Sequence, residues 1–506
     1  MRSLFRRRPP RPTWDPTTPI IRLSAGDTIT LGDLYSGVQV WGSTGSGKTS
    51  GSMRALCRGL FKAGAGALCL CAKRDDRALY ERYARECGRG QDVLIFGPDD
   101  SMLRYNFIEA ELARDGKSGS ESRGPGLVTN LTALLMTLSE ISSRGGCSGG
   151  TSREDEGYFR RAAQQLSTNA LHALVVASRV GGAVGSRGGV SIPDLQRYVT
   201  SMPQSMEEVA SPSWREQSFC FRTLQAAERA PMTESERLDL DLSISYALGE
   251  WATLADRTKS SVLSTLTSTL DLLSRGTCRD LLSSPTTNVS PEQCWGGAIV
   301  IVDLPVLVYH DIARLIAVIL KFCWQRASMR RDLSRGDRPM AIIADESHLF
   351  AASPDWEFQA VARGSNTATI YATQSLSNYL EVFGEHSESR VHALLGNLQT
   401  QFFHQLTDVR TIRYAQDLIG TRRTLLFSGN TSCASSDLGA ILGMGDPGTS
   451  AGFSEQELPE LRASHLNSLR KGGPANRFVV DALLYQGGKV FKATRRTWRP
   501  VSFVQS

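Results

Sequence analysis

Short apolar runs alternate with amphipathic stretches over the first hundred residues. Residues 37–41 form an apolar, β-rich run, and similar runs follow at 66–72 and 91–98. The segments between them, 49–63 and 75–87, space their apolar residues as helices do. Buried strands that alternate with helices are typical of a parallel sheet covered by helices. The pattern therefore predicts an α/β fold with a central, mostly parallel sheet.

The pattern changes after this first part of the chain. Residues 109–275 have mostly helical periodicity, and strand signals return afterwards. These later strand signals lie at 296–305, 339–347, 368–375 and 400–406. A sheet that stops and resumes predicts a mainly helical domain inserted into the α/β domain. Residues 421–455 are rich in Gly, Ser and Thr, and we expect them to be irregular.

Charge and hydropathy add little to this picture. The net charge of +6 is a mild excess, compatible with nucleic acid but not diagnostic of it. The most apolar segment, Ile312–Trp324, contains Arg314 and Lys321 and is shorter than the roughly 18 residues a membrane span needs. It predicts an amphipathic core helix. We expect a cytoplasmic protein with reduced thiols and no metal-binding histidine cluster.

A glycine-rich loop follows the first strand. The sequence GSTGSGKT fits the pattern G-x-x-x-x-G-K-[ST], in which backbone N–H groups surround phosphates. Lys48 is expected to neutralise phosphate charge, and the Thr49 hydroxyl to bind Mg²⁺. The loop therefore predicts a site for ATP and Mg²⁺. The residues expected to bind the nucleotide are Gly42, Ser43, Thr44, Gly45, Ser46, Gly47, Lys48, Thr49 and Ser50.

A phosphate-binding loop of this kind works with an acidic partner. The apolar run at 340–344 ends in Asp345 and Glu346, which places both carboxylates at the carboxyl edge of a parallel sheet. Asp345 is the expected Mg²⁺ ligand, and Glu346 the expected general base for water. The alternative is a pair that only caps the strand end. Asp303 ends another apolar run but has no second carboxylate beside it.

Two further polar residues follow the acidic pair. Gln374 ends the strand at 368–375, where a side chain can sense the γ-phosphate or position water. Arg363 lies between the two strands and could reach a neighbouring subunit as an arginine finger. From the residues alone, each is equally compatible with a solvated surface position.

The order of these motifs resembles the conjugative coupling proteins of the TraG/TraD kind, within the FtsK/HerA superfamily of ring-shaped motors. The resemblance covers most of the chain from about residue 36. It rests on GSTGSGKT, on the segments Arg104–Glu109 and Thr253–Leu273, and above all on Ala344–Gly420 with its ADES, ATQSLS and TDVRT elements.

This resemblance implies a RecA-like P-loop ATPase domain split by an all-α insertion. The expected segments are a basic disordered arm at 1–20, the ATPase domain at 21–110, the helical insertion at 111–285 and the second part of the ATPase domain with the C-terminal segment at 286–506. The family's acidic pair matches Asp345 and Glu346, its glutamine matches Gln374, and its trans-acting arginine matches Arg363.

The implied function is an ATP-hydrolysing DNA translocase that feeds DNA, single- or double-stranded, into a type IV secretion system. The implied partners are DNA, further copies of the chain in a homo-hexamer, a relaxase and secretion-channel proteins. The alternatives are a receptor-type ATPase that recruits protein substrates without moving DNA, and a phage- or plasmid-borne packaging or defence translocase.

The sequence departs from the family in two places. Typical members begin with transmembrane helices, whereas no segment here is apolar enough to form one. Attachment at the cytoplasmic face of the inner membrane would then be peripheral, through a partner or the basic arm. The family also has an acidic residue directly after the second strand, where Ala72 and Lys73 stand in this chain.

Overall fold

The computed structural model describes residues 14–99, 102–115, 125–143, 153–180, 189–285, 287–384, 388–432 and 448–505. Within them, a nine-stranded sheet forms the centre of the molecule, in the order β13-β12-β9-β3-β8-β7-β4-β6-β5. Its strands are β3 (Val38–Trp41), β4 (Gly66–Leu70), β5 (Val93–Phe96), β6 (Ile299–Val302), β7 (Met340–Ala344), β8 (Thr367–Thr373), β9 (Thr400–Phe403), β12 (Val479–Gln486) and β13 (Trp498–Val504).

The strands from β9 to β5 in this order run parallel, and β12 and β13 extend the sheet antiparallel. Strands β4, β7 and β8 are buried along their whole length. This burial explains the apolar runs of β4 and β7, because helices cover a parallel sheet on both faces. The predicted α/β class with a mostly parallel sheet is confirmed.

Two hydrophobic cores lie on the two faces of the sheet. Along β7, Ala341 and Ile343 belong to one core and Ile342 to the other, as strand alternation requires. Helices α2 (Arg54–Lys62) and α3 (Arg74–Glu86) contribute to the first core. The other face is covered by α16 (Val306–Met329), α17 (Pro354–Val361), α18 (Leu376–Phe383), α19 (Glu388–Gly396), α20 (Val409–Ile419) and α22 (Ala463–Asn467).

Helix α16 contains the segment expected to be an amphipathic core helix. It is more deeply buried than expected, because Lys321 is also enclosed, with 2% of its side chain exposed. Its ammonium group pairs with Asp355 on α17 at 2.5 Å. Among the described residues, no helix has both the length and the hydropathy for a membrane span.

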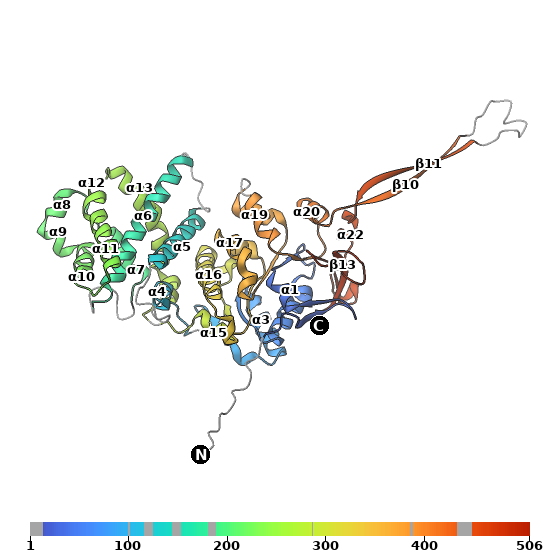
Figure 1. Ribbon diagram of the computed structural model, residues 1–506, viewed down its shortest axis with the longest axis horizontal. Helices are drawn as coiled ribbons and strands as arrows, with labels where there is room; N and C mark the ends of the chain where they lie inside the picture. Colours follow the sequence, from blue (N-terminus) through green and yellow to red (C-terminus); the bar gives the residue numbers. More distant parts are fainter. Residues whose placement is uncertain are drawn as a thin grey trace, which may run out of the picture.

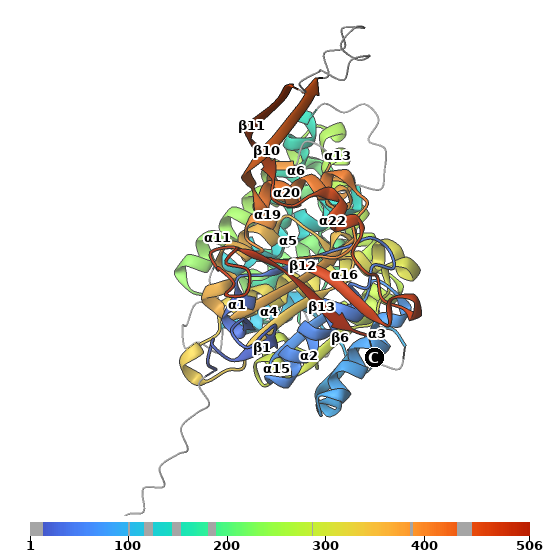
Figure 2. The ribbon, with the colours of Figure 1, turned by 90° about the vertical axis from the view of Figure 1, so that its right-hand side faces the viewer.

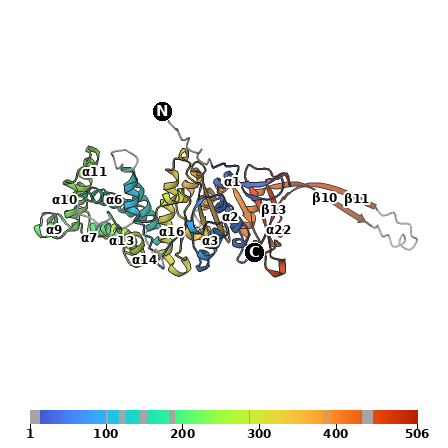
Figure 3. The ribbon, with the colours of Figure 1, turned by 90° about the horizontal axis from the view of Figure 1, so that it is seen from below.

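Between β5 and β6 the described residues form helices and no strand. They are α4 (Phe107–Asp115), α5 (Pro125–Ser143), α6 (Arg153–Ala177), α7 (Ile192–Thr200), α8 (Met206–Ala210), α9 (Pro212–Gln217), α10 (Phe219–Glu228), α11 (Glu234–Ser245), α12 (Trp251–Thr253), α13 (Asp256–Leu273), α14 (Gly276–Leu282) and α15 (Pro291–Trp295). Helices α5 to α13 gather at one end of the molecule, away from the sheet (Figures 1 and 3). The exact domain boundaries stay a prediction.

The expectation of irregular structure at 421–455 was wrong for residues 421–432 and 448–455, and residues 433–447 lie outside the described residues. Strands β10 (Thr421–Ser432) and β11 (Gly448–Pro459) form an antiparallel ribbon that projects from the opposite end of the molecule (Figures 1 and 2). Most of the ribbon is exposed to solvent, which explains its polar composition. Its two strands are held together by cross-strand hydrogen bonds, which do not require a buried apolar face. Phe427 and Phe453 lie directly opposite each other and are largely exposed.

The first residues of the described chain pack beside the sheet. Strands β1 (Pro19–Arg22) and β2 (Thr28–Thr30) pair antiparallel and lead into α1 (Leu31–Tyr35). Most of the expected basic arm, residues 1–13, lies outside the described residues.

Candidate functional site

The loop between β3 and α2 has the geometry of a phosphate-binding loop. Gly45 and Gly47 have φ angles of 70° and 86°, which side chains other than glycine rarely adopt. At Gly47, an added Cβ would also lie 2.6 Å from the Val480 side chain. After the loop, a π-helical turn η1 (Thr49–Met53) begins the helix that continues as α2. The chain thus directs a helix N-terminus towards the loop, where anions bind.

Lys48 is held inside this loop. Its ammonium group donates a hydrogen bond to the Gly42 carbonyl at 2.6 Å, and the residue is buried. Burial lowers the pKa of Lys48, while the carboxylates of Asp345 and Glu346 act in the opposite direction. The protonated form of Lys48 is therefore stabilised by its anionic neighbours, and a bound phosphate would stabilise it further.

Asp345 approaches the loop from the end of β7. The Thr49 hydroxyl donates to Asp345 Oδ2 at 2.7 Å, and Asp345 is buried. A hydroxyl and a carboxylate oxygen at this separation are the ligand types that Mg²⁺ prefers. Among the described residues, no group of three His, Cys, Asp or Glu side chains is placed so that it could bind a metal ion through protein ligands alone. Phosphate oxygens and water would therefore have to complete the coordination shell of this ion.

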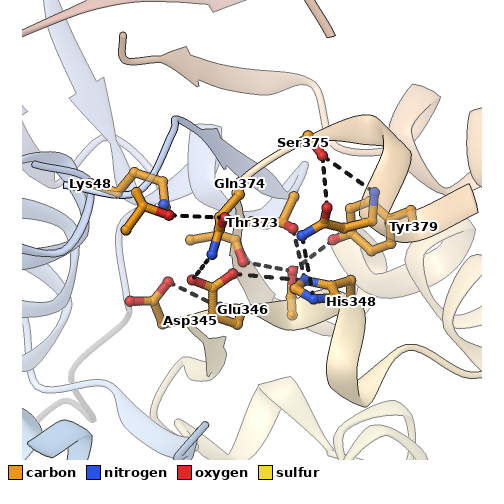
Figure 4. A network of polar contacts seen from close by, with 12 residues as sticks. Lys48, Asp345, Glu346, His348, Thr373, Gln374, Ser375 and Tyr379 are labelled. Atoms are coloured by element: carbon orange, nitrogen blue, oxygen red, sulfur yellow. Dashed lines mark hydrogen bonds and ion pairs between the residues drawn. The ribbon is translucent and has the colours of Figure 1, made fainter. Parts of the chain in front are cut away.

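Glu346 lies beside Asp345 and is connected to the loop through Gln374 (Figure 4). Gln374 Nε2 donates to Glu346 Oε1 at 3.1 Å, and Gln374 Oε1 accepts from the Thr44 hydroxyl at 3.1 Å. The amide thus spans from the phosphate loop to the carboxylate. The second oxygen, Glu346 Oε2, is buried, has no hydrogen-bond partner among the described residues and lies 3.8 Å from His348 Nδ1.

Burial alone would raise the pKa of Glu346. The charge of Lys48, the Gln374 hydrogen bond and the charge of Lys73 outweigh burial and hold this pKa below its usual range. The backbone of Glu346 has a φ of 49°, in the left-handed region. Non-glycine residues in this region are uncommon and concentrate at functional sites. Glu346 is therefore an ionised carboxylate held by its surroundings in an unusual conformation.

These groups surround one pocket of about 360 Å³. It is lined by Thr44, Gly45, Ser46, Gly47, Lys48, Thr49, Ser50, Lys73, Leu79, Arg82, Tyr83, Glu346, Gln374 and Gln505. Most of the residues expected to bind nucleotide therefore line one cavity. Asp345 is hydrogen-bonded to Thr49, which is one of the lining residues. Gly42 and Ser43 lie at the start of the loop, where the Ser43 amide donates to the Gln405 carbonyl at 2.9 Å.

Arg363 is not part of this pocket. It lies in the 3₁₀ turn η6 (Ala362–Ser365), at the amino end of β8, and it is exposed. Gln374 follows the carboxyl end of the same strand. Asp303 is also separate, because its carboxylate pairs with Arg77 at 2.8 Å beside another pocket.

Sequence reasoning missed several residues that contact the pocket. Leu79, Arg82 and Tyr83 come from α3, and Gln505 reaches Ser50 from the end of the chain at 2.6 Å. No motif signals these four. Lys73 had a signal, since it follows a buried strand at the carboxyl edge of the sheet.

His404 supports the loop from behind. Its Nε2 lies 2.7 Å from the Ser52 hydroxyl, and its Nδ1 lies 3.1 Å from the Asp481 carbonyl on β12. Burial and the nearby charge of Lys48 lower the pKa of His404 to about 3. The imidazole is therefore neutral and links the helix after the loop to the C-terminal strands.

Comparison with known proteins agrees with this arrangement. Residues 339–470 match the family model described as the TraM recognition site of TraD and TraG. The unbound form of the bacterial conjugative coupling protein TrwB gives a TM-score of 0.54 at 12% identity, covering 97% of this chain and 91% of that chain. TrwB in complex with the ATP analogue ADPNP gives the same values. TrwB in complex with ADP and Mg²⁺ gives 0.53 at 11% identity, covering 95% and 88%. No curated protein sequence matches the chain.

The sheet order, the loop and the acidic edge define a RecA-like P-loop α/β fold, which this chain shares with TrwB. The resemblance to TraG/TraD-like coupling proteins is confirmed, and the matching family model covers the region that carries Asp345, Glu346, Arg363 and Gln374.

Proposed function

We propose that this chain is an ATPase of the coupling-protein type, which uses ATP hydrolysis to move DNA, or a DNA–protein complex, in conjugative transfer. The observation that carries the proposal is the connected set of Thr49, Asp345, Glu346 and Gln374 around the pocket that holds Lys48. Structures of TrwB, which shares the fold, are in complex with ADPNP and with ADP and Mg²⁺.

Each residue has a role in this proposal. The loop N–H groups and Lys48 would bind the phosphates, and Thr49 and Asp345 would hold a Mg²⁺ ion, which would neutralise charge on the transferred phosphoryl group. Glu346, whose carboxylate is held next to the loop by Gln374, accepts a proton from the attacking water. Gln374 fixes the carboxylate relative to the loop and senses the γ-phosphate.

The proposed assembly supplies an arginine finger in trans. We place ATP between neighbours in a homo-hexameric ring, with Arg363 of one subunit facing the pocket of the next. Because residues 339–470 match the region that bears the TraM recognition site in TraD and TraG, we also propose a protein partner at this part of the surface. The proposed location is cytoplasmic, with peripheral attachment at the inner membrane beside a relaxase and channel proteins.

The test is the rate of ATP hydrolysis with and without single-stranded and double-stranded DNA. We expect DNA to raise the rate, and Lys48→Ala to abolish nucleotide binding or turnover because the loop loses its cation. ATP hydrolysis that DNA never changes, combined with stimulation by a protein partner, would favour the receptor-type ATPase instead. Hydrolysis at the wild-type rate in Lys48→Ala would show that the pocket is not the active site.

A further inference from the structure

Lys73 is the one lysine besides Lys48 that lines the described pocket, and no motif assigns it a role. It follows β4, whose last residue pairs with Ala344 on β7, so the sheet register brings Lys73 next to the acidic pair. Its Nζ lies 3.3 Å from Glu346 Oε1, on the same oxygen that accepts from Gln374. The side chain is 47% exposed, whereas Glu346 is buried.

The backbone of Lys73 is fixed even though its side chain is half in water. Asp76 Oδ2 accepts hydrogen bonds from the N–H groups of Ala72 and Lys73, both at 2.8 Å. Asp76 is itself buried at the start of α3. The residue therefore presents a flexible four-carbon chain from a rigid base, and its ammonium group can change partner without moving the loop.

The charges around the pocket give the ammonium group two competing partners. Lys48 and Lys73 face Asp345 and Glu346, while Arg82, which also lines the pocket, lies 4.0 Å from Glu86. A general base acts within about 3 Å of the water that it activates, and this water attacks the γ-phosphate. A γ-phosphate bound at Lys48 and Thr49 would therefore place negative charge only one water molecule away from Glu346. Lys73, already in contact with Glu346, lies within reach of the same phosphate. Lysine binds phosphate as a compact point charge.

We propose that Lys73 is a γ-phosphate ligand that exchanges partners: it pairs with Glu346 in the absence of a γ-phosphate and with the phosphate when ATP is bound. The exchange removes the Lys73 cation from Glu346 when the γ-phosphate is bound, which makes the carboxylate a stronger base at the moment when it is needed. It also allows the pocket to distinguish ATP from ADP. This inference rests on the proposed function of the pocket as an ATP site.

The test compares the affinity of each variant for ADPNP and for ADP, both with Mg²⁺, by titration calorimetry. In Lys73→Met we expect ADPNP to bind about 10-fold more weakly, the size of a partly exposed charge-assisted hydrogen bond. Binding of ADP should change less than about twofold, because ADP has no γ-phosphate. Lys73→Arg keeps the charge and should restore most of the ADPNP affinity.

Arg74→Met is the matched control, because Arg74 is the next residue, is exposed and lines a different pocket. It should leave both affinities unchanged. If Lys73→Met weakens ADPNP and ADP equally, or neither, Lys73 is only an ion-pair partner of Glu346 and the inference is wrong. If the wild-type protein binds neither nucleotide, the proposed function fails instead. Circular dichroism melting curves confirm that the variants fold.

Discussion

The carboxylate of Asp355 is the anionic partner of a fully enclosed lysine, and its removal should destabilise the protein strongly. Asp355 Oδ2 accepts from Lys321 and from the Ala352 N–H at 2.9 Å, while Asp355 Oδ1 accepts from Gln325 at 2.9 Å. In Asp355→Ala, the Phe350 carbonyl remains as a partner of the ammonium group but carries no full charge. Breaking a buried ion pair from one side typically costs about 3–5 kcal/mol.

A similar free-energy cost follows from the protonation equilibrium of Lys321. Burial lowers the pKa of Lys321, and Asp355 opposes this shift. Without Asp355 the folded protein can avoid a buried charge by releasing the proton. Neutralising a lysine with a pKa of about 10.4 at pH 7 costs about 4.6 kcal/mol, at about 1.36 kcal/mol for each pH unit. This cost is a ceiling for the lysine's share of the destabilisation, and it agrees with the range for broken buried pairs.

The neutral lysine gives the variant a distinctive pH dependence. In Asp355→Ala, the unfolded chain binds one proton more than the folded chain, so stability rises with pH up to about 10.4. Between pH 7 and pH 9 the variant should regain up to about 2.7 kcal/mol relative to wild type. Chemical denaturation followed by circular dichroism at both pH values measures this difference.

Two controls separate the buried charge from other effects. Adding Lys321→Met to Asp355→Ala should recover most of the stability, because no unpaired charge is then buried. Asp271→Ala breaks an exposed pair with Arg275 and should cost less than about 1 kcal/mol. A destabilisation below about 1 kcal/mol in Asp355→Ala, or an equal destabilisation at pH 7 and pH 9, would refute the reasoning.

Three further outcomes are expected. Glu346→Gln should bind ATP but hydrolyse it about 10²–10⁴ times more slowly, as removal of a general base requires, whereas the same phenotype in Asp303→Asn would mean that the acidic motif was misplaced. Mixed Arg363→Ala and Lys48→Ala subunits, each inactive alone, should recover part of the ATPase rate; rings that stay inactive at every ratio would contradict a trans arginine. Deleting residues 2–12 should reduce the salt dependence of DNA or anionic-lipid binding, by about one unit of slope for each phosphate that the arm neutralises; unchanged binding to both would mean an idle tail.

The parallel strands of the central sheet were predictable because each carries a short, mainly apolar run, whereas the antiparallel strands β12 and β13 were not predicted. The run at residues 339–347 became β7, with Asp345 and Glu346 at its carboxyl edge. Parallel topology then decides which side chains meet, since the carboxyl ends of parallel strands share one edge. For this reason Gln374 could be placed near Glu346 without any knowledge of side-chain contacts. The roles of these residues stay predictions.

The ribbon β10–β11 could not be predicted in the same way. Its strands are held by pairing with each other, so they carry no buried face and no apolar period. The C-terminal contacts were also beyond sequence reasoning. Val480 packs against Gly47 and Gln505 reaches Ser50, although more than 400 residues separate each pair. Only the tertiary fold brings the end of the chain to the phosphate loop.

The length of strand β8 decides whether Arg363 can reach the pocket of its own subunit. Strand β8 has seven residues, and at about 3.3 Å for each residue it spans about 23 Å between the turn with Arg363 and the loop with Gln374. An extended arginine side chain covers only a fraction of this length, about 7 Å from Cα to the guanidinium at the bond lengths of a polypeptide. Arg363 therefore cannot reach the pocket of its own subunit while β8 stays paired on both sides with β3 and β7. If Arg363 acts on a γ-phosphate, that phosphate belongs to a neighbouring subunit, so at least two copies of the chain must associate for the reaction.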